Sequence, residues 1–95
     1  MKATLLLHER LEYPDGALIE IRIWEVPEPV PPSEHRLKYS MVYIVGGARI
    51  IGYDNERGKG DHRHDREVET DYMFSGMAQL LADFRAAVVA ERGSI

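Results

Sequence analysis

Hydrophobic positions in the N-terminal part of the chain follow the two-residue period of a half-buried β-strand. Isoleucine recurs at every other position from Ile19 to Ile23, with polar residues between. Two apolar-rich stretches, residues 4–13 and 17–26, flank a Pro-Asp-Gly turn signal at residues 14–16. The first stretch could also begin a helix, but the turn favours a strand, so we predict a β-hairpin.

A second pair of strands is predicted over residues 36–55. Apolar and aromatic residues occupy every other position from Leu37 to Val45, and the Gly-Gly pair at residues 46–47 fits a two-residue hairpin turn. Residues 27–35, before this hairpin, hold four of the five prolines and are predicted to form a loop, because proline lacks a backbone donor. Four strands in hairpin order indicate an antiparallel meander.

The C-terminal third changes to helical periodicity. Residues 67–74 are a possible fifth strand, Ser75 is a candidate N-cap, and Gly93 is a candidate helix stop. The apolar stripe of this helix consists of Met77, Leu80, Leu81, Phe84 and Val88. We therefore predict a single α+β domain over residues 1–95. Its antiparallel sheet has four or five strands in hairpin order, with one C-terminal helix packed on it.

The composition narrows the class of protein. The chain has 95 residues and no cysteine, which excludes a disulfide framework and a thiolate zinc site. No apolar run approaches about 18 residues, and the N-terminal apolar run is too short for a signal peptide. We therefore expect a cytoplasmic protein that does not enter a membrane. A core this small is compatible with a homodimer.

The charge distribution permits a local basic site on an acidic protein. The net charge of −4 argues against a surface that binds nucleic acid over its whole extent. However, four cationic residues cluster in one stretch: Arg57, Lys59, Arg63 and Arg66. The Gly-Lys-Gly sequence within it is not a P-loop, because the upstream glycine spacing and the following Ser or Thr are missing.

The candidate chemistry is concentrated in residues 53–65, YDNERGKGDHRHD. His62 and His64 would face the same side of a strand. This spacing suits two imidazoles on one metal ion, with Asp61 or Asp65 as the carboxylate ligand. It equally suits two proton-transfer groups. A solvated polar loop without chemistry is the third interpretation.

Other residues of the same stretch favour a functional site. Gly58 and Gly60 allow the backbone to turn sharply or to approach a ligand closely. Arg57 and Lys59 could bind a phosphate, the arginine through two hydrogen bonds. A strand end holds side chains in fixed orientations. The residues at the predicted strand end are Tyr53, Asp54 and Asn55.

The segment from Arg49 to Val89 resembles the TumE family of small bacterial toxins from toxin–antitoxin pairs. The resemblance rests on Tyr-Asp-Asn at a strand end, on Lys-Gly-Asp-His-x-His, and on the sequence YMFSGMAQLLADFRAAV, an aromatic segment that leads into one terminal helix. It implies a small cytoplasmic toxin that a helix-turn-helix antitoxin neutralises. Because many small bacterial toxins cleave RNA, the resemblance favours a ribonuclease.

Our first hypothesis is a metal-independent endoribonuclease that acts on RNA without a cofactor. The two histidines would supply the base and the acid, and cationic residues would stabilise the charge that develops on the phosphate. Tyr53 would stack a base or hold a histidine. The candidate catalytic residues are His62, His64, Lys59 and Tyr53. The candidate substrate-binding residues are Arg57, Arg63, Asp54 and Asn55.

Two alternatives remain open. The first is a metal-dependent hydrolase or nuclease in which Asp61, His62 and His64 bind one divalent ion, with Asp54 as a further candidate ligand. The second is a non-catalytic module that binds a partner through its aromatic strands and helix. In that case the polar stretch would only stabilise the fold.

Overall fold

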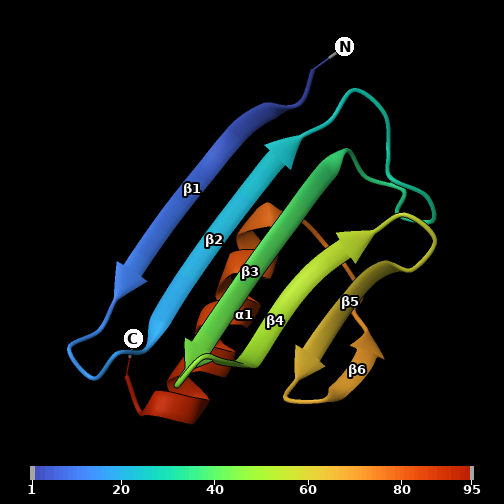
Figure 1. The fold of residues 1–95 in the computed structure, drawn as a ribbon. Coiled ribbons are helices and arrows are strands. Elements are labelled where there is room, and N and C mark those ends of the chain that lie inside the picture. The colour runs from blue at the N-terminus through green and yellow to red at the C-terminus, as the bar shows by residue number, and fades with distance from the viewer. Residues whose placement is uncertain (1, 95) are drawn as a thin grey trace.

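The computed structural model describes residues 2–94, which form six strands and one helix (Figure 1). Neighbouring strands are antiparallel and follow one another in chain order, so the sheet is a meander. The predicted hairpin-ordered sheet with one C-terminal helix is confirmed, but it has six strands, not four or five. The elements are β1 (Thr4–Glu12), β2 (Leu18–Glu25), β3 (Leu37–Val45), β4 (Ala48–Glu56), β5 (Gly60–Asp65), β6 (Val68–Asp71) and α1 (Met77–Arg92).

The additional strand is β5, which lies within the polar stretch. Buried and partly exposed positions alternate along it, although its side chains are charged or imidazole. The hydrophobic period by which a strand is recognised in a sequence is therefore missing. Gly58 and Gly60 make the preceding turn with φ angles of +88° and +77°. The predicted fifth strand is found as β6.

Both predicted hairpin turns form. In the first turn, Asp15 Oδ1 accepts a hydrogen bond of 2.9 Å from the Ala17 N–H. The segment before it pairs antiparallel with β2, so β1 is a strand rather than a helix. In the second turn, Gly46 and Gly47 join β3 to β4 with φ angles of +58° and +79°. A two-residue hairpin with both central residues left-handed matches the twist of the flanking strands.

Helix α1 covers one face of the sheet and lies behind β2, β3 and β4 in Figure 1. Leu80, Phe84 and Val88 form its buried stripe, and the predicted Met77 and Leu81 pack at the edge of the same core. We call this the helix-side face. The opposite face, which no other element of residues 2–94 covers, is the open face. The sheet residues of the core are Ile19, Ile21, Ile23, Tyr39, Met41, Tyr43, Ile51 and Tyr53.

The two ends of α1 differ in how well the sequence predicts them. Ser75 was expected at the N-cap, but Gly76 occupies that position, and no side chain within residues 2–94 caps the helix. The first helical hydrogen bond runs from the Leu80 N–H to the Gly76 carbonyl at 3.0 Å. At the other end, Gly93 adopts the left-handed conformation, which confirms the predicted stop. The described part of the chain has no helix of the length and apolarity that a membrane crossing requires.

The proline-rich segment between β2 and β3 packs against the turn between β4 and β5. The Gly58 N–H donates a hydrogen bond of 2.8 Å to the Pro31 carbonyl. A Cβ atom on Gly60 would lie 3.0 Å from Pro32 Cγ. Gly60 therefore permits two loops to approach one another, and this contact brings the residues after Pro32 to the start of β5.

Candidate functional site

The register of β4 and β5 divides the candidate residues between the two faces of the sheet. Asp54 lies opposite His62, and Gly52 lies opposite His64. Because side chains alternate along a strand, the two histidines and Asp54 share the open face. The predicted residues on the helix-side face are Tyr53, Asn55, Asp61 and Arg63. The single predicted site is therefore two separate clusters.

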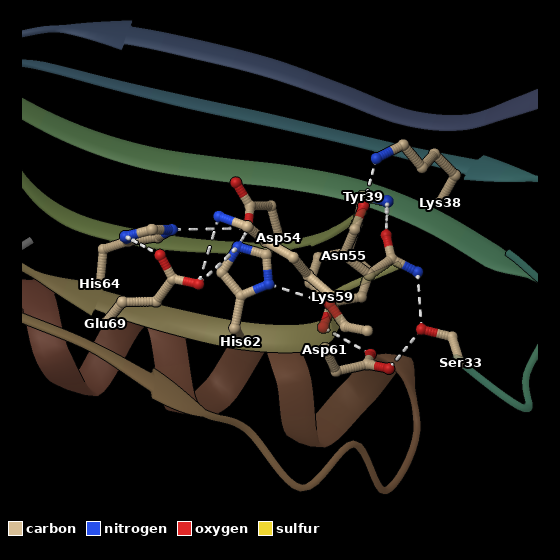
Figure 2. A network of polar contacts seen from close by, with 11 residues as sticks. Ser33, Lys38, Tyr39, Asp54, Asn55, Lys59, Asp61, His62, His64 and Glu69 are labelled. Carbon is tan, nitrogen blue, oxygen red and sulfur yellow. Dashed lines mark hydrogen bonds and ion pairs between the residues drawn. The ribbon is translucent and has the colours of Figure 1, made fainter. Parts of the chain in front are cut away.

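Asp54, His62 and His64 form the histidine cluster on the open face (Figure 2). One nitrogen from each imidazole and one carboxylate oxygen lie within 4.8 Å of one another. His62 Nε2 is 2.5 Å and His64 Nε2 is 3.7 Å from Asp54 Oδ1. His62 is only 2% exposed, whereas the side chain of Asp54 is 18% exposed. Asp54 therefore forms the accessible edge of the cluster, and His64, 8% exposed, is the less buried of the two histidines.

The surroundings of His62 determine its tautomer. Its Nδ1 lies 2.9 Å from the Gly60 carbonyl oxygen, which can only accept a hydrogen bond, so Nδ1 carries a proton. Its Nε2 lies close to Asp54 Oδ1, but the two atoms are not aligned for a hydrogen bond. Both are buried without a hydrogen-bond partner among the described residues. The cluster therefore lacks a group that would satisfy two facing, buried polar atoms.

Glu69 and Lys59 border the histidine cluster. Glu69 of β6 lies with its carboxylate oxygens 3.9 Å from His62 Nε2 and 3.9 Å from His64 Nδ1. Lys59 extends from the turn toward the cluster, and its Nζ is 3.5 Å from Glu69 (Figure 2). The lysine thus places a positive charge beside the cluster and partly neutralises the glutamate.

Arg49 lies next to His64 because Gly52 leaves room for its side chain. A Cβ atom on Gly52 would lie 2.9 Å from Arg49 Cδ and 3.6 Å from His64 Cβ. Burial, together with the Arg49 guanidinium, lowers the pKa of His64 below its usual value, against the attraction of Asp54 and Glu69. The imidazole of His64 is therefore neutral near pH 7 and can offer a lone pair.

Asp61 belongs to a second group of residues, the Asp61 cluster, on the helix-side face. Its carboxylate contacts Ser33 Oγ at 2.5 Å, His35 Nε2 at 2.7 Å and the Tyr39 hydroxyl at 2.6 Å. Phe74 stacks on His35 with 3.6 Å between ring centroids. Burial alone would raise the pKa of Asp61, but these hydrogen bonds outweigh burial and lower it. The carboxylate of Asp61 thus contacts other residues than His62 and His64. The carboxylate that lies beside these two histidines is that of Asp54.

Asn55 joins the ends of β3 and β4 beside the Asp61 cluster. Its Oδ1 accepts a hydrogen bond of 3.0 Å from the Tyr39 N–H, and its Nδ2 donates one of 2.7 Å to the Leu37 carbonyl. The residue is completely buried. These bonds satisfy backbone groups where the ladder between β3 and β4 ends. Asn55 was predicted to bind substrate, but its burial keeps it from the surface.

The remaining predicted residues do not reach the histidines. Tyr53 packs in the core, edge-to-face with Tyr72 at 5.1 Å, and the Arg63 guanidinium lies 5.7 Å from the Tyr53 ring centroid. Both are on the helix-side face, so the expected contact of Tyr53 with a histidine is wrong. Arg57 lines a groove with the proline-rich residues 26–31. The predicted residues that share the histidine cluster or border it are Asp54, Lys59, His62 and His64.

Sequence reasoning missed several residues of both clusters. Glu69 could have been found from a two-residue turn at residues 66–67, which places it opposite His64. The other residue missed beside the histidines is Arg49. Ser33 and His35 meet Asp61 across 28 and 26 residues of sequence, and no local pattern indicates that contact.

The chain is thus a small α+β protein with a histidine–carboxylate cluster on the open face of a meander sheet. The model of the family described as Toxin TumE matches residues 2–92, and the chain belongs to this toxin family. The resemblance inferred from residues 49–89 is confirmed and extends through the N-terminal hairpin. No curated protein and no solved structure matches the chain. Membership of a toxin family implies an antitoxin partner.

Proposed function

We propose that this protein acts as a toxin by cleaving RNA at the histidine cluster. The observation that carries the proposal is the position of Asp54 and His64, which form a polar edge on the uncovered face of the sheet. Lys59 and Arg49 flank this edge with positive charge. Membership of the TumE family supports the toxic role, and cleavage of RNA is our addition to it.

The site contains the groups that phosphodiester cleavage requires. The attacking 2′-hydroxyl must lose its proton, negative charge builds on the phosphate oxygens, and the leaving oxygen must gain a proton. The histidine cluster would accept the proton of the attacking 2′-hydroxyl, and Lys59 and Arg49 would bind phosphate oxygens. The new bond to phosphorus expels the 5′-oxygen, which takes a proton from Lys59, and a 2′,3′-cyclic phosphate remains. His62 is too buried to touch RNA and acts through the other two members of the cluster.

The overall charge suits an enzyme that releases its product. The chain carries a net charge of −4, so its surface as a whole repels a polyanion. Attraction at the site would come from the cations near the cluster, Lys59 and Arg49. We expect binding of RNA to be local and to weaken as salt is added.

The partner we propose is an antitoxin of the helix-turn-helix class that neutralises the toxin in the cytoplasm. Strand β1 lies at one edge of the sheet, where its outer backbone groups can pair with another chain. It also exposes apolar side chains to solvent: Leu5, Leu6 and Leu11. A second copy of this chain, giving a homodimer, is the alternative occupant of the same edge.

The proposal is tested with matched variants expressed from an inducible promoter, followed by growth curves and gels of total RNA. His64→Ala is compared with His8→Ala, which removes an exposed histidine of the same face on β1. Lys59→Ala is compared with Arg57→Ala, because both residues lie in one turn and only Lys59 borders the cluster. Wild type and the two controls should arrest growth and fragment RNA. The two site variants should do neither at equal soluble expression.

Each other outcome contradicts a defined part of the proposal. Growth arrest with intact RNA would show that the protein is toxic but does not act by cleaving RNA. Arrest by His64→Ala at wild-type strength would place the activity outside the histidine cluster. Soluble wild-type protein that causes no arrest would support a non-catalytic partner-binding module.

A further inference from the structure

We infer that Asp54, His62 and His64 bind one divalent transition-metal ion. The binding site follows from the geometry of these three residues, whose ligand atoms lie within 4.8 Å of one another. The part that the ion plays in RNA cleavage rests on the proposed function. The sequence suggested Asp61, His62 and His64 as ligands, with Asp54 as a further candidate. The inferred set keeps Asp54 and omits Asp61, which faces the helix side.

The unpaired state of two buried atoms is the strongest support. Asp54 Oδ1 and His62 Nε2 are 2.5 Å apart, both are buried, and neither has a hydrogen-bond partner within residues 2–94. Because Nδ1 of His62 faces the Gly60 carbonyl oxygen, the nitrogen left for a metal ion is Nε2, whose lone pair would point at Asp54 Oδ1. A lone pair and a carboxylate that face one another at this distance repel. A cation bound by both atoms would remove the repulsion.

The surroundings of His62 are those of a metal ligand. Ligating histidines commonly donate the hydrogen of their other ring nitrogen to a carbonyl, which fixes the tautomer and the ring orientation. His62 makes this contact with Gly60 at 2.9 Å. Zinc ligands lie at about 2.0–2.2 Å from the ion and so roughly 3.3 Å from each other. Asp54 and His62 would separate by roughly 1 Å on binding, and His64 would move inward.

The donor set indicates the class of metal ion. Two imidazole nitrogens and one carboxylate oxygen suit Zn²⁺, Co²⁺ or Ni²⁺, whereas Mg²⁺ and Ca²⁺ prefer oxygen ligands alone. We place Glu69 outside the ligand set, because Lys59 pairs with it at 3.5 Å. Three protein ligands leave a coordination position open, as in catalytic zinc sites. That position would face the accessible edge, where the ion could activate an attacking oxygen.

Binding is measured on purified, tag-free, full-length protein stripped of metal with a chelator. Zn²⁺ affinity is obtained by competition with a chromophoric chelator, Co²⁺ binding by its visible absorption, and Mg²⁺ serves as the comparison ion. Asp54→Asn and His64→Ala are the site variants, and His8→Ala is the control. Asp54→Asn preserves the side-chain shape, and His64 is less buried than His62, so circular dichroism should show both variants folded.

Wild type and His8→Ala should bind one equivalent of Zn²⁺ or Co²⁺, and neither should bind Mg²⁺ at the same concentration. Both site variants should lose more than tenfold in affinity. Zn²⁺ should raise the melting temperature of wild type and leave that of the folded site variants unchanged. Folded wild type that binds neither Zn²⁺ nor Co²⁺ would overturn the inference. Site variants with wild-type affinity would overturn it as well.

The RNA assay separates this inference from the proposed function. Metal-free protein, checked by elemental analysis, should leave RNA intact, and addition of Zn²⁺ should restore fragmentation. If metal-free protein fragments RNA at the full rate, the ribonuclease stands and the catalytic role of the ion fails. If the protein binds Zn²⁺ in the cluster and never fragments RNA, the metal site stands and the proposed substrate fails.

Discussion

The hairpin of β4 and β5 carries a histidine–carboxylate cluster on each face, and the two clusters differ in how their polar atoms are satisfied. The Asp61 carboxylate receives hydrogen bonds from three side chains. In the histidine cluster, the facing atoms of Asp54 and His62 have no such partner in the described part of the chain. Asp61 and His62 are neighbours on β5, and each belongs to a cluster of histidine and carboxylate groups. The Asp61 cluster stabilises the fold, whereas the histidine cluster is a candidate reactive site. Completeness of hydrogen bonding, rather than residue type, distinguishes the two.

The largest expected effect comes from removing the two carboxylates in turn. Asp61→Ala should lower the free energy of unfolding by about 3 kcal/mol, because it leaves three donors, two buried and one partly buried, without an acceptor. Asp54→Ala in metal-free protein should change it by less than about 1 kcal/mol, or should stabilise the fold, because the buried Asp54 Oδ1 has no hydrogen bond to lose. Urea denaturation measures both. Equal losses would show that the clusters contribute alike to stability.

A somewhat smaller effect is expected at Asn55. Asn55→Ala should reduce the free energy of unfolding by about 2 kcal/mol, since a backbone N–H and a carbonyl lose their buried partner. The exposed neighbour Glu56 provides the control, and Glu56→Ala should stay within about 0.5 kcal/mol of wild type. At a temperature where Asn55→Ala remains folded, it should still fragment RNA. A folded but inactive variant would place Asn55 in the functional site.

Alkaline pH provides a graded test of the Asp61 cluster. Burial, and then the hydrogen bond to Asp61, raise the pKa of Tyr39 above its usual value of 10.0. A raised pKa in the folded state means that the stabilisation is complete below about pH 10 and declines as pH rises. This one proton accounts for a fall of up to about 1.4 kcal/mol per pH unit above that value. Tyr39→Phe should show a shallower fall in urea denaturation, and parallel curves would contradict the prediction.

The smallest effect is expected outside both clusters, at the ion pair between the last hairpin and the helix. Arg66 donates hydrogen bonds of 3.0 and 2.8 Å to the Glu91 carboxylate. Both side chains are solvated, so Arg66→Ala should barely shift the urea midpoint, and added salt should reduce even that shift. Arg66 also holds a φ of +56°, so Arg66→Gly should be at least as stable as Arg66→Ala. A less stable glycine variant would contradict that reasoning.

The fold could be predicted largely because its strands are amphipathic in a regular way. Alternating apolar side chains reveal β2 and β3, and proline and glycine mark the turns between them. Strand β5 could not be found in the same way, because hydrogen bonding and burial of polar groups replace hydrophobic burial there. Its two faces are both polar, and the hydrophobic period carries no information about it.

The candidate site could be predicted only in part, since its third member depends on strand pairing. The spacing of His62 and His64 places them on one face of any strand. Alternation along β5 alone turns Asp61 to the other face, but only the pairing of β4 with β5 brings Asp54 opposite His62. The partners of Asp61 come from a distant loop, whose position depends on packing between Gly60 and Pro32. Local sequence patterns contain neither piece of information.

The alternation along β5 also limits how insertions and deletions can be tolerated during evolution. A single residue inserted between His62 and His64 would move one imidazole to the helix side, whereas two inserted residues would keep both on the open side. The turn at residues 57–59 is different, because a change of its length leaves His62 and His64 on the same face of β5. Related chains should therefore vary in the number of residues between Asp54 and His62. The two histidines should stay an even number of positions apart in the sequence.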